Sequence, residues 1–463
     1  MTGIRDFVVL FIIIGLIPVS LKRPWHGILG WYWIAYMVPH GLTWGFARTL
    51  PVAMIVGGAT LVGFILSKDR KPLPRTGTTF FMLASSVHFT LTTILAHNPE
   101  LAWGKWDRVS KILLMTFVTM SLFQDRVRLR WLYMVPALGL GFYGVKGALW
   151  VLRSGGGGTG AEEGNRVFGP DMSFFADANS IGPALCMILP ILLYLSRDEE
   201  RPWLKRILQL AFGLSIISII FTFSRGAFLG LAVVLTVLIW RSPWRMRFAT
   251  ALLLVGLIAA PLAPERLWQR IGSISQQESA DTRDMSTVGR LQSFETAWNI
   301  AVSHPFFGEG FKALWNPDLW FVYFGPNFYK TFDAHSVYFE VLSEHGFVGL
   351  GLYLGALIST LLTLRRLRKR WRNHAEHGYI SRYAEMTQLS LYPFIICGAF
   401  IPFAYFDLYF LFLATSTMLF ALSQQADKVE VPIRAEKPGR RSSALAVRAN
   451  AIPSRSRRRP RHA

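Results

Sequence analysis

Long apolar runs, separated by short polar and basic segments, make up most of the chain. A bilayer has a hydrocarbon core of roughly 30 Å, which an α-helix of about 20 mostly apolar residues can cross. The pattern therefore predicts an all-α, polytopic membrane protein with twelve or thirteen transmembrane helices, since three of the runs are short. The runs lie near residues 7–21, 26–40, 47–67, 78–96, 109–123, 131–150, 180–196, 206–223, 226–240, 248–263, 335–364, 387–404 and 406–422.

Composition supports this class, because 52% of the 463 residues are hydrophobic, which excludes an ordinary soluble enzyme. The first apolar run lacks a small-residue cleavage site and is followed by further runs. We therefore expect a retained helix and not a signal peptide. Cys186 and Cys397 lie inside apolar runs, so we expect neither a disulfide framework nor thiol chemistry.

The formal net charge of +21 comes mostly from basic residues that lie in every second loop between the apolar runs. If the N-terminus lies outside, every inner loop is basic and the inner segments hold most of the 49 Lys and Arg residues, which is the positive-inside pattern. A nucleic-acid-binding protein would gather such charge on a soluble domain. We therefore expect a membrane partner and no nucleic acid.

The same topology divides the chain into two parts. Residues 1–422 form the membrane domain, with long outer loops at 151–179 and 264–334. Residues 423–463 are rich in Arg, Pro and Ser and show no apolar periodicity, so we expect a disordered, basic cytoplasmic tail. Long outer loops of this kind are usually functional or disordered.

The second outer loop contains a helical pattern and many aromatic residues. Leu291, Phe294, Trp298 and Ala301 recur at helical spacing, which predicts a short amphipathic helix. This helix either lies in the membrane interface or packs inside an outer cap, and the pattern leaves both open. The aromatic residues suit a lipid–water interface and are Trp315, Trp320, Phe321, Tyr323, Phe324, Phe328 and Tyr329.

The segment DAHSVYFEVLSEHGFVGL at 333–350 carries the main candidate for chemistry, His335. A titratable ring at the mouth of a membrane helix is costly and therefore a functional candidate. Its spacing to Phe339, Leu342, Gly346 and Gly349 predicts that they share one helical face. The alternative is a hydrogen-bonded histidine that closes the helix entrance.

Two arginines are predicted on the same side of the membrane. Arg225 lies in SRGA and Arg290 in GRLQSF, and a guanidinium binds phosphate oxygens with two parallel donors. Arg225 could instead anchor a helix at the interface. Arg290 could instead cap the amphipathic helix or pair with Asp284 or Glu295.

Three polar residues at predicted helix starts are candidates for substrate binding. Asp177 and Asn179, in DAN, are placed to bind sugar hydroxyls or to cap a helix, and Ser336 follows His335 with the same two alternatives. His345 and His304 are expected to have no chemical role. The sequence has no cluster suited to a required metal, and we expect no metal and no cofactor.

Four segments, in order, resemble the O-antigen ligase and polymerase superfamily: FADANSIGPAL, FTFSRGAFLGL, VGRLQSFETAWNIAVSHPFFGEGF and AHSVYFEVLSEHGFVGLGLYLG. Its ligases carry a His followed by Asn, Ser or Gln, then nine residues and a Gly. Here these are His335, Ser336 and Gly346. The ligases also have an Arg followed by a Leu four residues later, and here these are Arg225 and Leu229. MTFVTMSLF, GFYGVKGAL and PHGLTWGFA resemble the putative O-glycosylation ligase associated with the exosortase A system, over most of residues 1–422.

The resemblance implies a metal-independent, inverting glycosyltransferase of the bacterial inner membrane, with its active site facing the periplasm. Its donor would be a glycan on undecaprenyl diphosphate, and its acceptor a protein, lipid or polysaccharide. Arg225 and Arg290 would hold the diphosphate, and His335 would orient or deprotonate the acceptor hydroxyl. Two alternatives remain: a repeat-unit polymerase of the same superfamily, and a lipid-linked sugar flippase or exporter, which needs no base.

Overall fold

The computed structural model describes residues 3–154, 166–242, 245–247, 250, 254, 285–326, 328 and 330–435. The chain divides into two units, Met1–Leu422 and Ser423–Ala463. Within the described residues the regular elements are helices, and no strand is present. The protein is therefore all-α, as the hydrophobic pattern predicts.

The helices fall into two groups along the chain. Those before the second outer loop are α1 (Ile4–Lys22), α2 (Pro24–Met37), η1 (Pro39–Leu42), η2 (Phe46–Thr49), α3 (Val52–Leu66), α4 (Gly77–Ile94), α5 (Pro99–Leu122), α6 (Arg126–Ser154), α7 (Ala178–Asp198), α8 (Pro202–Ile220) and α9 (Arg225–Arg241). Those that follow are α12 (Met285–Ser303), η5 (Ala313–Trp315), α13 (Pro317–Tyr323), α14 (Val337–Arg370), α15 (Gly378–Cys397) and α16 (Asp407–Ala435).

Six of the described helices are long and apolar enough to cross a membrane, namely α1, α6, α7, α8, α14 and the part of α16 up to Lys428. The helix α3 is apolar but shorter. Helices occupy twelve of the thirteen predicted spans, and the remaining one, 248–263, lies largely outside the described residues. The protein is a multi-pass membrane protein.

Local sequence explains where many helices begin. Side-chain oxygens of Thr76, Asn98, Asp177 and Ser224 accept hydrogen bonds from the first turns of α4, α5, α7 and α9. Proline stands at the start of α2, α5, α8 and α13, where its missing N–H costs nothing. These caps satisfy backbone donors that a helix start leaves open.

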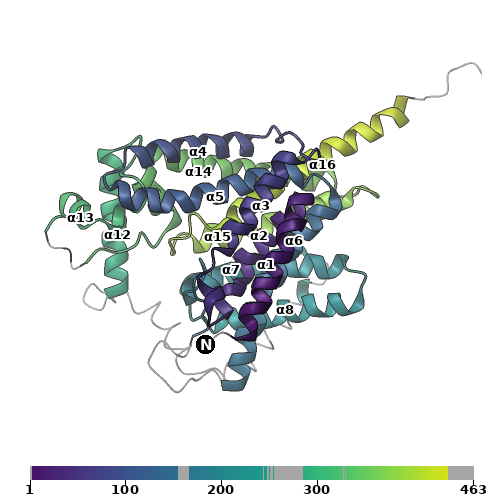
Figure 1. The fold of residues 1–463 in the computed structure, drawn as a ribbon, viewed down its shortest axis with the longest axis horizontal. Helices are drawn as coiled ribbons and strands as arrows, with labels where there is room; N and C mark the ends of the chain where they lie inside the picture. The colour runs from purple at the N-terminus through teal and green to yellow at the C-terminus, as the bar shows by residue number, and fades with distance from the viewer. Residues whose placement is uncertain are drawn as a thin grey trace, which may run out of the picture. The chain divides into compact units, whose positions relative to one another are not determined.

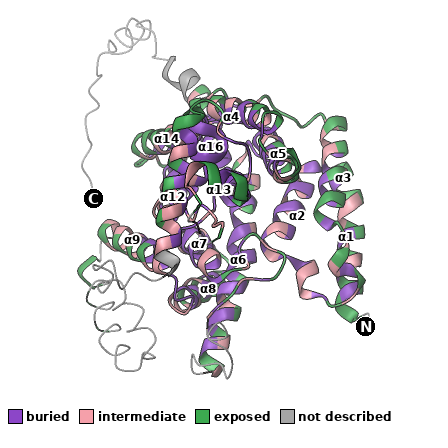
Figure 2. Cartoon of the chain, turned by 90° about the vertical axis from the view of Figure 1, so that its left-hand side faces the viewer, coloured by how far each residue is buried: buried purple, intermediate pink, exposed green. Residues whose placement is uncertain are grey.

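The helices that border the candidate site pack in two neighbouring groups. The helices α4, α5 and α14 run side by side (Figure 1), and α4 contacts both α5 and α14. The helix α7 contacts α6, α8, α9 and α15, and α15 also contacts α14. In Figure 2, which looks at the left-hand side of Figure 1, α12 and α13 lie in front of these helices. The helices α12 and α13 thus cover one end of these two groups.

The helix α14 is interrupted at Gly346, whose backbone has φ 66° and ψ −172°. The segment 304–310 fills the break, because Glu309 N and Gly310 N donate to the carbonyls of Ser343 and Glu344 at 3.1 and 3.0 Å. On the far side of the break, Phe347 N donates to Pro305 O at 2.8 Å. The break separates a short first part of α14, residues 337–345, from the long second part.

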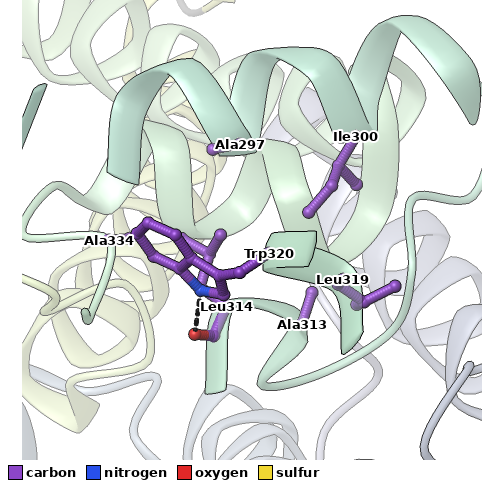
Figure 3. Close-up of a cluster of buried hydrophobic side chains, with 7 residues drawn as sticks. All are labelled: Ala297, Ile300, Ala313, Leu314, Leu319, Trp320 and Ala334. Atoms are coloured by element: carbon purple, nitrogen blue, oxygen red, sulfur yellow. Dashed lines mark hydrogen bonds between the residues drawn. The ribbon is translucent and has the colours of Figure 1, made fainter. Parts of the chain in front are cut away.

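The second outer loop has a hydrophobic core of its own around Trp320. Its indole N–H donates to Leu314 O at 2.8 Å, and Figure 3 shows Ala297 and Ile300 on the side of α12 that faces the ring. Phe324, Phe328 and Phe332 surround the indole with ring centroids about 6 Å away. Trp320 is therefore a core residue, contrary to the prediction that places it in the lipid–water interface.

The predicted helix forms as α12. One face, which includes Ser293, Ala297 and Ile300, is buried against the loop core and α14. Leu291 and Trp298, predicted on the apolar face, are instead about half exposed. The helix thus packs against the loop core and α14 on one side and leaves Leu291 and Trp298 exposed on another, and its place relative to the membrane interface stays a prediction.

The second unit begins within α16. This helix continues past Leu422 to Ala435, so the first part of the predicted disordered tail is helical. The remaining tail, 436–463, lies outside the described residues, as do Asp284 and Tyr329.

Candidate functional site

His335 stands two residues before α14, with its backbone in the left-handed region at φ 44°. The start of the helix is fixed by Val337 N, which donates to Gly398 O at the end of α15 at 2.7 Å. Ser336 occupies the cap position and is buried, but its side chain makes no capping hydrogen bond. His335 therefore lies in a tight turn outside the helix.

The predicted shared face of α14 is wrong for two reasons. His335 precedes the helix, and Gly346 breaks it, so the helical spacing does not run through either residue. Periodicity assumes a continuous helix, which the positive φ at Gly346 interrupts. The site must be built from contacts between elements and not from one helical stripe.

Arg225 is the first residue of α9, directly after the capping residue Ser224. The thiol of Cys397, at the end of α15, donates to Gly226 O at 3.1 Å. The next residue of α15, Gly398, is the acceptor for Val337 N. The end of α15 therefore joins the start of α9, which carries Arg225, to the start of α14.

The start of α7 lies at the same place. Asp177 caps α7 through Asn179 N at 2.7 Å, so the capping prediction describes its hydrogen bond. The side-chain oxygen of Asn179 accepts a hydrogen bond from Arg166 at 2.8 Å, and Arg166 also donates to Thr222 O at 2.9 Å. Arg166, missed by the sequence reading, ties the starts of α7 and α9 together.

Arg290 enters the site from the first turns of α12. The neighbouring Gly289 lies against the Phe332 ring, and Phe294 stacks on Phe339 of α14 with ring centroids 4.4 Å apart. These contacts hold the beginning of α12 beside the beginning of α14.

The pKa of His335 depends on the charged groups that lie near its ring. Burial lowers the pKa of His335 below its ordinary value, and the positive charge of Arg290 lowers it further. The negative charges of Asp333 and Asp177 act in the opposite direction. Arg290 and Asp177 thus each lie within electrostatic reach of His335, while the start of α9, which carries Arg225, is joined to the start of α14 through the end of α15.

A buried cluster of charged residues lies further along α14. We call Lys105, Glu340, Glu344, His345 and Tyr405 the Lys105 cluster. The Lys105 ammonium donates to both carboxylates at 2.8 Å. Sequence reading missed this cluster and gave His345 no role. The available indication was the pair Glu340 and Glu344, two charged residues inside the apolar run 335–364.

The Lys105 cluster continues into a hydrogen-bond chain. The Tyr405 hydroxyl donates to Glu344 at 2.7 Å, so its oxygen is left to accept from His345 Nε2 at 2.9 Å. His345 Nδ1 lies 2.6 Å from the Thr92 hydroxyl, which also donates to Phe89 O at 3.0 Å. Tyr405 and His345 thus link Glu344 to Thr92 of α4.

A further buried carboxylate, Glu309, lies in the segment that fills the break of α14. It accepts a hydrogen bond from Tyr323 at 2.9 Å and lies 3.3 Å from His304 Nε2 and 3.8 Å from His97 Nδ1. Burial and Glu309 raise the pKa of Tyr323 to about 12. His304, predicted to be a plain loop residue, thus borders a buried acid.

No group of three or more His, Cys, Asp and Glu side chains is placed to hold a metal ion in the parts of the chain that the structure describes. The expectation of a metal-free site remains a prediction.

Comparison with known families divides the chain between two models. Residues 210–354 match the family described as O-Antigen ligase, and residues 4–200 match a family of unknown function (DUF5935). A search of curated proteins finds no match to the chain. Arg225, Arg290 and His335 fall in the first match, whereas Asp177 and Asn179 fall in the second.

The fold defines a multi-pass membrane protein in which the ends of α7, α9, α14 and α15 are joined by hydrogen bonds near His335. The match over 210–354 supports the O-antigen ligase and polymerase superfamily and a membrane glycosyltransferase-like role.

Proposed function

We propose that this protein transfers a glycan from an undecaprenyl-diphosphate-linked donor to an acceptor on the periplasmic side of the bacterial inner membrane. The observation that carries the proposal is the position of His335. Its ring lies where the starts of α7, α9 and α14 meet, within reach of the charges of Arg290 and Asp177. A base and fixed cations are the two requirements of a glycosyl transfer that releases a diphosphate.

In this reaction His335 takes the proton of the acceptor hydroxyl. The hydroxyl oxygen forms a bond to the anomeric carbon, and the bond from that carbon to the diphosphate oxygen breaks. His335 suits the base role because its lowered pKa keeps the imidazole neutral at neutral pH. Attack opposite the leaving diphosphate inverts the anomeric centre.

The leaving diphosphate carries the negative charge that develops in the reaction, and we assign its binding to Arg225 and Arg290. A guanidinium remains charged and donates two parallel hydrogen bonds to phosphate oxygens. Arg225 is also the first residue of α9, so the positive end of the helix dipole adds to its field. We assign contacts with the sugar hydroxyls to Asp177, Asn179 and Ser336.

The acceptor decides between the members of the superfamily. A ligase passes the glycan to a protein, a lipid or a finished polysaccharide, whereas a polymerase joins repeat units. We favour the ligase, because His335, Ser336 and Gly346 follow the ligase spacing. The resemblance to ligases associated with the exosortase A system favours a protein or extracellular polymer as acceptor.

The proposal is tested with His335→Ala and His335→Gln in purified protein supplied with lipid-linked donor. We expect His335→Ala to lower transfer by about 100-fold or more, because a positioned general base contributes at least that factor. Donor binding and membrane abundance should remain normal, since the arginines are intact. Residual transfer in His335→Gln alone would indicate orientation of the hydroxyl and not proton removal.

Two results would count against the assignment. Near-normal transfer by a well-expressed His335→Ala protein would remove the base and favour a flippase. Loss of abundance in both variants, with normal transfer per molecule, would reduce His335 to a residue that closes the helix entrance.

A further inference from the structure

The Lys105 cluster, which the proposed reaction does not use, contains more negative than positive charge. One ammonium, that of Lys105, serves two carboxylates, Glu340 and Glu344, which are 9% and 3% exposed. The ammonium also lies over the rings of Tyr405 at 4.6 Å and Phe311 at 5.7 Å. Removing such charges from water is costly, and a buried ion pair seldom stabilises a fold more than apolar packing does.

The two carboxylates also accept hydrogen bonds from donors in other elements. Glu344 accepts from Lys312 N at 2.7 Å and from the Tyr405 hydroxyl at 2.7 Å. Glu340 accepts from Ala404 N at 3.1 Å. The cluster therefore joins α5, the first part of α14, the segment after α12 and the connection from α15 to α16.

These joined elements are the ones that carry the candidate site. The first part of α14 begins two residues after His335, and the segment with Lys312 follows α12, which carries Arg290. The connection with Ala404 follows Gly398, the residue that fixes Val337 N. A change in the cluster would thus move the groups of the site relative to one another.

The first part of α14 needs such a support, because the break at Gly346 separates it from the rest of the helix. Residues 337–345 form little more than two turns, and an isolated helix of this length is not stable on its own. Glu340 and Glu344, four residues apart, place both carboxylates on one face of this short helix, toward Lys105.

We propose that Lys105 is a positioning residue for His335: it holds the first part of α14 so that the imidazole meets the acceptor hydroxyl. This inference rests on the proposed transferase function. Lys105 contacts neither substrate, and it acts through Glu340 and Glu344.

The test compares Lys105→Met with Lys105→Arg and with a matched control. Lys111→Met lies on the same helix and removes an exposed ion pair, in which Lys111 Nζ lies 2.6 Å from Asp107. We expect Lys105→Met to lower kcat by about 10-fold to 100-fold with the KM for donor unchanged, because a misplacement of about 1 Å costs about that much. Lys105→Arg should restore part of kcat, and Lys111→Met should resemble the wild type.

Lys105→Met leaves two buried carboxylates without a cation and could fail to fold. The triple variant Lys105→Met, Glu340→Gln, Glu344→Gln removes all three charges together and serves as the second variant. We expect it to accumulate normally and still to transfer slowly, because neutral amides do not recreate the charged clamp.

A readout independent of activity completes the test. Hydrogen exchange in residues 335–345 should quicken in Lys105→Met relative to the wild type and to Lys111→Met, while residues 351–364 stay unchanged. Unchanged exchange, unchanged kcat in a folded variant, or a loss confined to donor KM would each overturn the proposal. If the wild type transfers no glycan, the proposed function fails, and the exchange result alone then decides whether Lys105 holds this helix.

Discussion

At the scale of single residues, two side chains of the site are presented from strained turns. His335 has φ 44°, and Phe223, two residues before Arg225, has φ 50°. The left-handed region costs a non-glycine residue about 1–2 kcal/mol, so surrounding contacts must hold these turns. Val337 N on Gly398 O and the Cys397 thiol on Gly226 O supply such contacts. Histidine and arginine are thereby aimed from tight turns at helix starts.

The charge of Asp177 makes the pH dependence of transfer testable. Asp177 favours the protonated form of His335, so Asp177→Asn should lower the pKa of His335 further. The neutral imidazole then persists to lower pH, and the acidic limb of the kcat/KM profile should move to lower pH. Asn is also a good helix cap, so α7 should still form. The measurement is the pH profile of transfer for variant and wild type.

Asp171→Asn provides the control for this prediction. Asp171 belongs to the loop before α7, is largely exposed and pairs with Arg48 at 3.3 Å. Its removal should leave the acidic limb in place. A limb that moves to higher pH in Asp177→Asn, or that moves equally in both variants, would contradict the role of Asp177 beside His335.

At this scale the sequence predicted the position of the candidate site residues, but it did not predict their hydrogen-bond partners. His335, Arg225 and Asp177 are each found at a helix start, where hydropathy changes sharply. Arg166 was not predicted, because its partners Asn179 and Thr222 come together only when α7 and α9 pack. No local pattern encodes such a contact.

At the scale of elements, the break of α14 depends on one glycine. Gly346 has φ 66° and ψ −172°, a region that only glycine adopts readily, and an added Cβ would lie 2.6 Å from Pro305 O. Gly346→Ala should therefore lower the melting temperature and the membrane abundance. The backbone strain alone costs roughly 1–3 kcal/mol of folding free energy, and the clash of the added Cβ increases that cost. Thermal unfolding in detergent measures the effect.

Gly351→Ala is the matched control, on the second part of the same helix. An added Cβ at Gly351 meets no atom within 4 Å, and alanine favours a helix over glycine by about 1 kcal/mol. Its melting temperature should be unchanged or slightly higher. Equal melting temperatures for the two alanine variants would mean that the break tolerates a side chain.

The helices themselves follow from hydropathy, but their interruptions do not. Apolar length predicted nearly every described helix of the membrane domain, because a span is a local property. The break at Gly346 was not predicted, since its backbone groups are satisfied by Pro305, Glu309 and Gly310, more than thirty residues earlier in the chain. The Lys105 cluster was not predicted for the same reason, because its residues lie far apart in the sequence.

At the scale of the whole molecule, the basic loops predict which end faces the cytoplasm. Positive-inside bias places the outer-loop helix α12 outside and the turn after α14 inside. Ser303 and Asn373 are exposed and suit cysteine labelling. An impermeant thiol reagent applied to spheroplasts should label Ser303→Cys and not Asn373→Cys. The native Cys186 and Cys397 are buried and should give little background.

Permeabilised cells are the control for this experiment, because both positions should then be labelled. Labelling of position 373 and not of position 303 in sealed spheroplasts would reverse the orientation, and the site would then face the cytoplasm.

The interlock between the segment 304–310 and α14 has a consequence for biogenesis. Hydrocarbon does not tolerate open backbone groups, so the broken helix cannot stand in the bilayer before this segment has docked. The segment is synthesised before α14, but the two can interlock only once α14 has been made. A newly inserted α14 is therefore a continuous helix, and its first two turns separate only as the outer loop closes on them. Maturation of the site is a late event, after integration of the membrane helices.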